Sequence, residues 1–192
     1  QSIRRYVPVG VVAAISAYNF PLHINLWKIM PALATGNCVI LRPSPLTPLS
    51  ALALAEVAAE AGLPEGVLSI LAESGAEGAQ LLTTDPAVNM VSFTGSTEVG
   101  SIVAGQAAPS MKRLQLELGG KSAQIFLPDR VEAAFSAAIS VCMAHAGQGC
   151  VLGTRVFVPQ DDKAKVLGAM KASLTYARIG DSTDPETTMG PV

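Results

Sequence analysis

Cys150 lies in the stretch HAGQGCVLG, residues 145–153, where glycines surround a single thiol. A thiolate is a strong nucleophile, and glycines let a substrate approach it closely. Cysteine is also among the most buried residue types, so the stretch alone favours a small core residue in a turn. His145 is more typical of a helix end than of a base for this thiol. Cys38 and Cys142 fall inside expected elements, which predicts core positions for both.

Two further segments carry polar side chains at expected strand ends. LELGGKS, residues 116–122, places Glu117 between two leucines. Poor solvation there would make its carboxylate a stronger base, although a capping glutamate or one paired with Lys121 is the favoured reading from this segment alone. AYNFP, residues 17–21, places Asn19 just beyond the first strand. Its amide could donate to a developing oxyanion, or satisfy the backbone of a turn.

A fourth segment, FTGSTEVG at residues 93–100, follows an expected strand and begins an expected helix. Gly95 leaves room for a ligand, and Ser96 or Thr97 can cap the helix, whose first amides would face an anion such as a pyrophosphate. The segment lacks the usual GxGxxG pattern, and capped helices are common without any ligand. Alone, it favours an ordinary capped helix over a phosphate site.

The elements that position these segments alternate along the chain. Short apolar runs predict strands, Ala- and Leu-rich patterns predict helices, and continuous apolar strands between helices predict a parallel sheet covered on both faces. The fold class is therefore α/β with a doubly wound parallel sheet, which binds nucleotides outside the carboxyl ends of its strands. The expected strands are 9–15, 38–41, 67–71, 88–93 and 113–117, and the expected helices are 22–34, 49–61, 75–82 and 96–106.

The alternating pattern of strands and helices is interrupted at Gly119-Gly120, where we predict a domain boundary. Residues 1–118 would form the doubly wound domain, and residues 119–192 only the opening of a second α/β domain. We expect strands at 123–127 and 154–158, helices at 131–146 and 161–177, and a polar loop from 178 onward. Because the sequence begins with Gln1 and ends at MGPV, we interpret it as the central piece of a longer polypeptide.

Composition narrows the possible partners. The 192 residues contain 13 Lys+Arg and 15 Asp+Glu, a net charge of −2 without a basic run, which argues against nucleic acid and anionic membranes. Only 15% of residues are charged and 49% are apolar, so we expect much of the surface to contact other protein. Three cysteines without CxxC spacing and two histidines suggest no metal site and no disulfide framework, and fit a reduced, cytoplasmic protein.

The order and spacing of the four segments resemble the NAD(P)-dependent aldehyde dehydrogenase superfamily, as do ALATGN at 32–37, AGLPEGV at 61–67 and the closing TTMGPV. The resemblance runs along essentially the whole chain and corresponds to the middle of longer family members. It implies most of a Rossmann-like cofactor domain in residues 1–118 and the N-terminal part of a catalytic domain in residues 119–192. It also implies an enzyme that acts on a small-molecule aldehyde, with NAD or NADP as cofactor. It also implies a homo-oligomer.

The resemblance also assigns roles to residues. Cys150 matches the nucleophile, Glu117 the general base and Asn19 the oxyanion donor. Cys150 would attack the aldehyde, hydride would pass to the nicotinamide to leave a thioester, and Glu117 would activate the water that releases the acid. The cofactor-binding residues that it implies are Ile15, Ser16, Ala17, Arg42, Ser44, Phe93, Gly95, Ser96, Val99, Leu118 and Gly119.

Two of the positions that depart from the family pattern follow the second expected strand. The sequence has Arg42 and Pro45 where members commonly have a lysine and a ribose-binding glutamate. Loss of the acid and gain of a guanidinium both favour a 2′-phosphate, so we predict tolerance of, or preference for, NADP. Two other functions stay open: a CoA-acylating relative, in which CoA instead of water takes the acyl group, and a non-catalytic dinucleotide-binding fragment.

Overall fold

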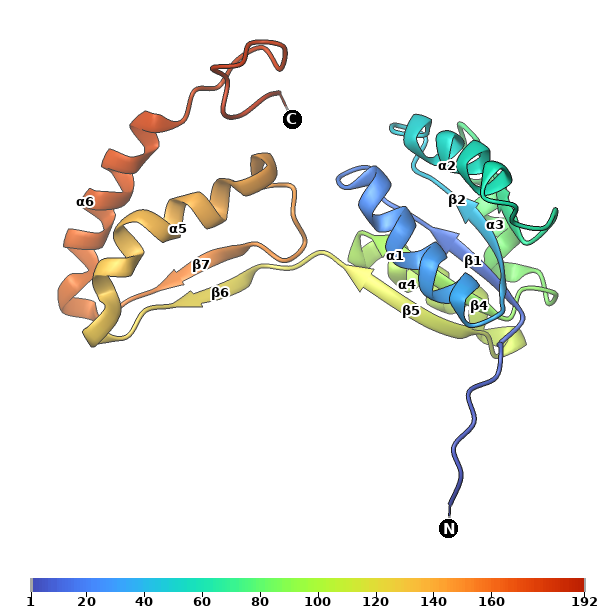
Figure 1. Cartoon of the computed structure of the whole chain (residues 1–192). Coiled ribbons are helices and arrows are strands. Elements are labelled where there is room, and N and C mark those ends of the chain that lie inside the picture. The colour runs from blue at the N-terminus through green and yellow to red at the C-terminus, as the bar shows by residue number, and fades with distance from the viewer. Residues whose placement is uncertain (1, 192) are drawn as a thin grey trace. The chain divides into compact units, whose positions relative to one another are not determined.

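The computed structural model describes residues 2–191, and the chain divides into two compact units, Gln1–Leu118 and Gly119–Val192 (Figure 1). The first unit has the sheet order β3-β2-β1-β4-β5, with each neighbouring pair parallel. This confirms the predicted doubly wound α/β fold, with element ends shifted by at most two residues. Its elements are β1 (Val11–Ile15), α1 (Pro21–Ala34), β2 (Cys38–Arg42), α2 (Leu49–Glu60), β3 (Leu68–Ile70), α3 (Glu77–Thr84), β4 (Met90–Gly95), α4 (Thr97–Ala107), the short 3-10 helix η1 (Ala108–Ser110) and β5 (Arg113–Leu118).

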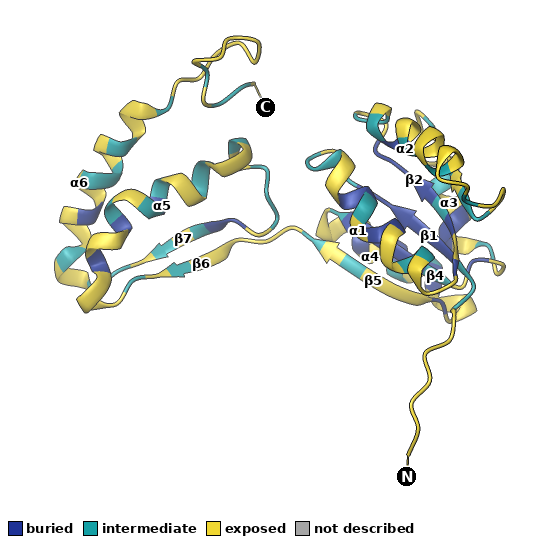
Figure 2. Ribbon diagram, in the orientation of Figure 1, coloured by how far each residue is buried: buried dark blue, intermediate teal, exposed yellow. Residues whose placement is uncertain are grey.

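Alternation along β1 divides the core of this unit between the two faces of the sheet. Ala13 and Ile15 pack with side chains from α3 and α4, whereas Ala14 packs with side chains from α1 and α2. Strand side chains alternate between faces, so small residues on β1 allow helices to pack on both. Figure 2 shows the buried residues concentrated in the central strands. Each fully buried Val, Leu or Ile there stabilises the unit by about 1.5–3 kcal/mol.

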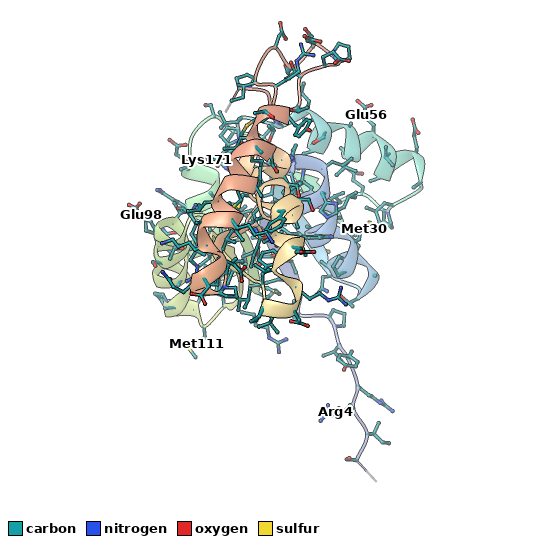
Figure 3. All side chains as sticks on the ribbon, turned by 90° about the vertical axis from the view of Figure 1, so that its left-hand side faces the viewer. Arg4, Met30, Glu56, Glu98, Met111 and Lys171 are labelled. Atoms are coloured by element: carbon teal, nitrogen blue, oxygen red, sulfur yellow. The ribbon has the colours of Figure 1, made fainter. Side chains whose placement is uncertain are left out.

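Cys38 differs from our expectation of a core position, because it is exposed. It is the first residue of β2, and its neighbours Val39 and Leu41 point to the opposite face, where α1 and α2 pack. Before β1, residues 2–8 are exposed, and Figure 3 shows Arg4 on this extended segment. Among residues 2–191, no helix combines the length and apolarity needed to cross a membrane.

The second unit pairs two parallel strands, one helix packs on them, and a second helix packs against the first. The expected helix at 131–146 is wrong in its extent: it begins as a 3-10 turn, and its α-helical part ends at Met143. The cause is a reversal in which His145, Ala146 and Gly147 adopt φ of 53°, 54° and 76°. The elements are β6 (Ser122–Ile125), η2 (Pro128–Ala133), α5 (Ala134–Met143), η3 (Ala144–Gly147), β7 (Gly153–Phe157), η4 (Gln160–Asp162), α6 (Lys163–Ser173) and η5 (Leu174–Tyr176).

Candidate active site

The strand order of the first unit reverses between β1 and β4, since β2 and β3 follow β1 outward on one side and β5 follows β4 on the other. In open α/β sheets, ligands bind outside the carboxyl ends of the strands at this switch point. Ile15 at the end of β1 lies beside Phe93 of β4, and Arg42 of β2 lies on its other side. Three of the predicted cofactor residues therefore line one edge of one sheet.

Ser16 follows directly after β1 at this edge. Its backbone N–H donates to the Arg42 carbonyl at 3.1 Å, which extends the ladder by one residue. Its hydroxyl is buried and has no hydrogen-bond partner among the described residues. A buried polar group without a partner is costly, so Ser16 fits a position where a bound polar ligand completes the hydrogen bonding. Ala17, the next residue, is half-buried.

The turn after β4 carries the second group of cofactor candidates. The Ser96 hydroxyl accepts a hydrogen bond from the Val99 N–H at 3.2 Å and so caps α4. A Cβ placed on Gly95 would overlap the ring of the buried Phe93, so packing favours glycine at this position. The first amides of α4, an eleven-residue helix, remain suited to a pyrophosphate.

Glu117 shares a sheet face with a buried lysine. Lys28 of α1 donates to Ser92 Oγ at 2.9 Å, and Ser92 donates to Gln115 Oε1 at 3.1 Å. Glu117 lies two residues beyond Gln115 on β5 and thus on the same face. Burial lowers the pKa of Lys28 from 10.5 to about 8, although the negative charge of Glu117 acts to raise it.

The Glu117 side chain is itself exposed, so the poor solvation that we expected from its leucine neighbours is not found. β5 is an edge strand, and α1 packs over β1 and β2 instead. The leucines on either side of Glu117 point to the other face, where Leu116 and Leu118 pack against the α3–α4 core. Asn19 belongs to the same unit, and lies half-buried in the turn between β1 and α1.

Cys150 lies half-buried in the loop between α5 and β7 of the second unit. Because β6 and β7 are parallel neighbours, the residues that precede them lie at one edge. A Cβ built on Gly120 would accordingly come 3.4 Å from the Cys150 carbonyl oxygen. The structure thus brings Gly120 next to the backbone of the candidate nucleophile. Gly119, the residue before it, is exposed.

Cys142 has a structural contact instead. Its thiol donates to the Gly153 carbonyl at 3.1 Å, and Gln124 Nε2 donates to the same carbonyl at 2.6 Å. These bonds tie α5 and β6 to the start of β7, directly after the Cys150 loop. Within residues 2–191, no group of three His, Cys, Asp or Glu side chains is placed to hold a metal ion.

The whole chain, residues 1–192, matches the aldehyde dehydrogenase family. It belongs to that family. Aldehyde dehydrogenase C from Pseudomonas syringae, solved as a mutant with NAD+ and octanal, is 38% identical with a TM-score of 0.92 over 97% of this chain and 39% of that one. An NADP-dependent enzyme from E. coli gives the same four values. The betaine aldehyde dehydrogenase of Staphylococcus aureus, solved with NAD+, is 37% identical with a TM-score of 0.92 over 96% of this chain and 37% of that one.

The chain therefore spans about two fifths of the length of these aldehyde dehydrogenases. Its five-stranded parallel sheet matches the Rossmann-like domain of these relatives. The family is a family of oxidoreductases that act on aldehydes. Relatives of equal similarity are associated with NAD+ in one case and NADP in another, so similarity alone does not choose the cofactor.

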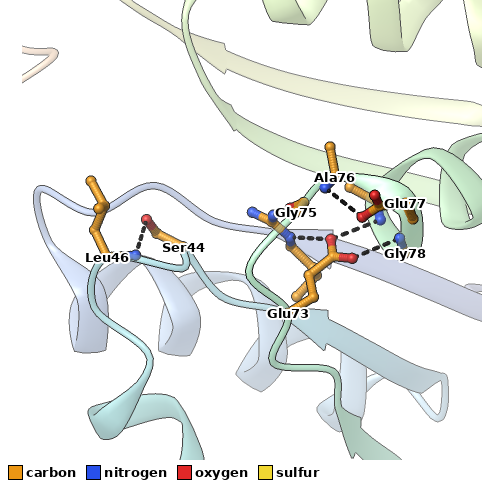
Figure 4. Close-up of polar contacts among 9 residues, drawn as sticks. Ser44, Leu46, Glu73, Gly75, Ala76, Glu77 and Gly78 are labelled. Atoms are coloured by element: carbon orange, nitrogen blue, oxygen red, sulfur yellow. Dashed lines mark hydrogen bonds and ion pairs between the residues drawn. The ribbon is translucent and has the colours of Figure 1, made fainter.

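Two charged residues that interact with candidate site residues were not predicted from the sequence. Lys28 could have been noticed, because it falls four residues after Ile24 on the buried stripe of α1, where a charge is unusual. Glu73 carried no such signal. It forms an ion pair with Arg42 at 2.8 Å, and 31 residues separate the two in the chain. Ser44, also at the end of β2, is buried and accepts a hydrogen bond from the Leu46 N–H at 3.3 Å (Figure 4).

Proposed function

We propose that this chain belongs to an enzyme that oxidises an aldehyde to a carboxylic acid through a thioester on Cys150. The observation that carries the proposal is the position of Cys150: a half-buried cysteine in a glycine-rich loop, adjacent to Gly120 of the Glu-Leu-Gly-Gly segment, in a member of the aldehyde dehydrogenase family. A thiolate at such a position can attack a carbonyl carbon and form a covalent thiohemiacetal.

Two other residues complete the proposed reaction. Asn19 donates a side-chain N–H to the oxyanion that forms at the carbonyl oxygen, together with the backbone N–H of Cys150. Glu117 takes a proton from water, which then attacks the thioester and releases the acid. The exposure of Glu117 fits this role, because its carboxylate is accessible to water.

The cofactor site is proposed at the switch point of the first unit. Bound NAD or NADP supplies the hydride acceptor for the oxidation. Ser16, Ala17 and Ile15 at the end of β1 and Arg42 and Ser44 after β2 would contact the adenosine part. The pyrophosphate would lie at Gly95 and Ser96, between the apolar side chains of Phe93 and Val99, and the nicotinamide would lie near Leu118 and Gly119.

In our proposal, the two units have different roles: residues 1–118 bind the cofactor, and residues 119–192 form the beginning of the catalytic domain. We further propose a cytoplasmic homo-oligomer, because only 15% of the residues are charged, which favours contact with other protein, and three cysteines without CxxC spacing fit a reducing compartment. The aldehyde is a small molecule, and neither nucleic acid nor a membrane is an expected partner.

The test measures NAD(P)H formation by the full-length protein with a panel of aldehydes and both cofactors. We expect Cys150→Ser to lower turnover by about 10³-fold or more, because the hydroxyl is a much weaker nucleophile. Cys142→Ser is the matched control: the same atom exchange keeps a donor for the Gly153 carbonyl, so activity should stay near the wild-type value. Undiminished turnover by the Cys150 variant would exclude the covalent mechanism.

The same assay separates the alternatives. Acid formed without added CoA supports hydrolysis with Glu117, whereas turnover only with CoA would identify an acylating enzyme. A full-length protein that binds dinucleotide but oxidises none of the aldehydes would support the non-catalytic reading.

A further inference from the structure

Arg42 lies where a doubly wound sheet recognises the adenosine ribose. It ends β2, beside Ile15 of β1, and its carbonyl accepts the Ser16 N–H. In this fold, an acidic residue beyond the second strand binds the ribose hydroxyls, and an arginine nearby accommodates a 2′-phosphate. The sequence alone therefore suggests that the Arg42 guanidinium is available to a phosphate.

The structure shows that this guanidinium is already engaged. Arg42 Nε donates to Glu73 Oε1 at 2.8 Å, and an Nη2–H donates to the Gly75 carbonyl at 2.5 Å. The Arg42 and Glu73 side chains are only 10% and 14% exposed. Two of the five N–H donors are thus used, and the charge of the guanidinium is balanced by a carboxylate in contact with it.

Glu73 is fixed from a second side by the start of α3. Its Oε2 accepts the Gly78 N–H at 2.7 Å, and its Oε1 accepts the Ala79 N–H at 3.1 Å (Figure 4). Burial by itself would raise the pKa of Glu73, but the hydrogen bonds from Arg42, Gly78 and Ala79 outweigh it and lower this pKa. The carboxylate therefore stays charged near neutral pH, and it cannot turn away from Arg42 without losing the backbone contacts.

We infer that Glu73 is a positioning residue that sets cofactor preference: by holding and neutralising Arg42, it weakens the recognition of a 2′-phosphate and shifts the enzyme toward NAD. A phosphate that approaches Arg42 also approaches the Glu73 carboxylate, so attraction and repulsion partly cancel. This inference rests on the proposed function, because it places the adenosine ribose beside β2. It deepens that proposal by naming the group that balances NAD against NADP.

The test compares the binding of 2′,5′-ADP and ADP to the full-length protein by calorimetry, since the two probes differ only in the 2′-phosphate. Glu73→Gln keeps the size of the side chain and one acceptor oxygen for Arg42 and Ala79, but it removes the charge and the acceptor for the Gly78 N–H. We expect its affinity for 2′,5′-ADP relative to ADP to rise by about tenfold. Glu77→Gln is the matched control, because Glu77 begins α3 four residues after Glu73 and accepts a hydrogen bond from the Ala76 N–H instead of one from Arg42. Its affinity ratio should equal that of the wild type.

A double variant, Arg42→Met with Glu73→Gln, removes both members of the pair and leaves no lone buried charge. The ratio of its affinities for 2′,5′-ADP and ADP should stay within about twofold of the wild-type ratio. In the wild type, attraction of the phosphate by Arg42 is largely offset by repulsion from Glu73. A ratio that falls tenfold in the double variant, or one that Glu73→Gln leaves unchanged, would overturn the inference while the proposed function stands. If the wild-type protein bound neither nucleotide, both would be wrong.

Discussion

Ser16 keeps its hydroxyl buried and without a partner among the described residues, whereas Ser44 and Ser96 use theirs to accept backbone N–H groups of their own unit. All three serines were predicted to bind the cofactor. The difference indicates that Ser44 and Ser96 shape their turns, and that Ser16 is the serine whose hydrogen bonding a ligand would complete.

Asn19→Ala in the full-length protein is expected to lower aldehyde turnover by about 10²–10³-fold, because an oxyanion without its side-chain donor is less stabilised. The measurement is kcat with a good aldehyde substrate. The rate of Cys150 alkylation provides the control and should change little, since Asn19 acts on the oxyanion and not on the thiol. Wild-type turnover by the variant would remove Asn19 from the mechanism.

The sequence predicted neither the contact of Cys142 with the Gly153 carbonyl nor that of Arg42 with Glu73, for one physical reason. The partner of Cys142 is 11 residues away in the chain and the partner of Arg42 is 31 residues away. Side-chain type shows which bonds a residue can make. Only the packed structure shows which partner takes them.

At the scale of elements, the loop before Cys150 contains a run of three left-handed residues, His145, Ala146 and Gly147. Non-glycine residues rarely adopt left-handed backbone, and the sequence pattern stays helical up to residue 146. The sequence therefore did not predict that α5 ends at Met143. The strands and the helices of the first unit were predictable because their apolar periodicity agrees with their packing. A reversal made by His and Ala leaves no such periodic signal.

Gly147→Ala is expected to lower the free energy of unfolding by about 1–2 kcal/mol, because φ is positive and an L side chain is strained there. The nearest atom to the added Cβ is the Cys142 carbonyl oxygen at 3.8 Å, so a clash does not contribute. Gly168→Ala in α6 is the matched control, with open space around the added Cβ. It should raise the same free energy by about 0.5–1 kcal/mol. Urea unfolding measures both, and equal signs would contradict the prediction.

At the scale of the whole molecule, Lys28 links stability to pH. Its pKa is about 8 in the folded chain and 10.5 when unperturbed, so the unfolded chain binds more protons between these values. The cost of the buried charge is present in full below pH 8 and disappears as the pH rises toward 10.5.

From pH 7 to pH 9.5, the wild-type free energy of unfolding should therefore rise by about 2 kcal/mol relative to Lys28→Met. Denaturant titrations at the two pH values measure this difference. Lys171→Met, which changes an exposed lysine of α6, should show no such difference from the wild type. If the difference in free energy of unfolding between the wild type and Lys28→Met were the same at both pH values, the lowered pKa of Lys28 would be contradicted.

The sequence by itself determined the fold class, the order of the elements and the family, because apolar periodicity, turn residues and motif spacing are local properties of the chain. It also pointed to Cys150, Glu117 and Asn19 through the spacing of their motifs. Only the tertiary structure decided which groups meet: Gly120 beside Cys150, Lys28 on the face of Glu117, and Glu73 on Arg42. These contacts join residues far apart in the chain, so their charge, burial and hydrogen bonding exist only once strands and helices have packed.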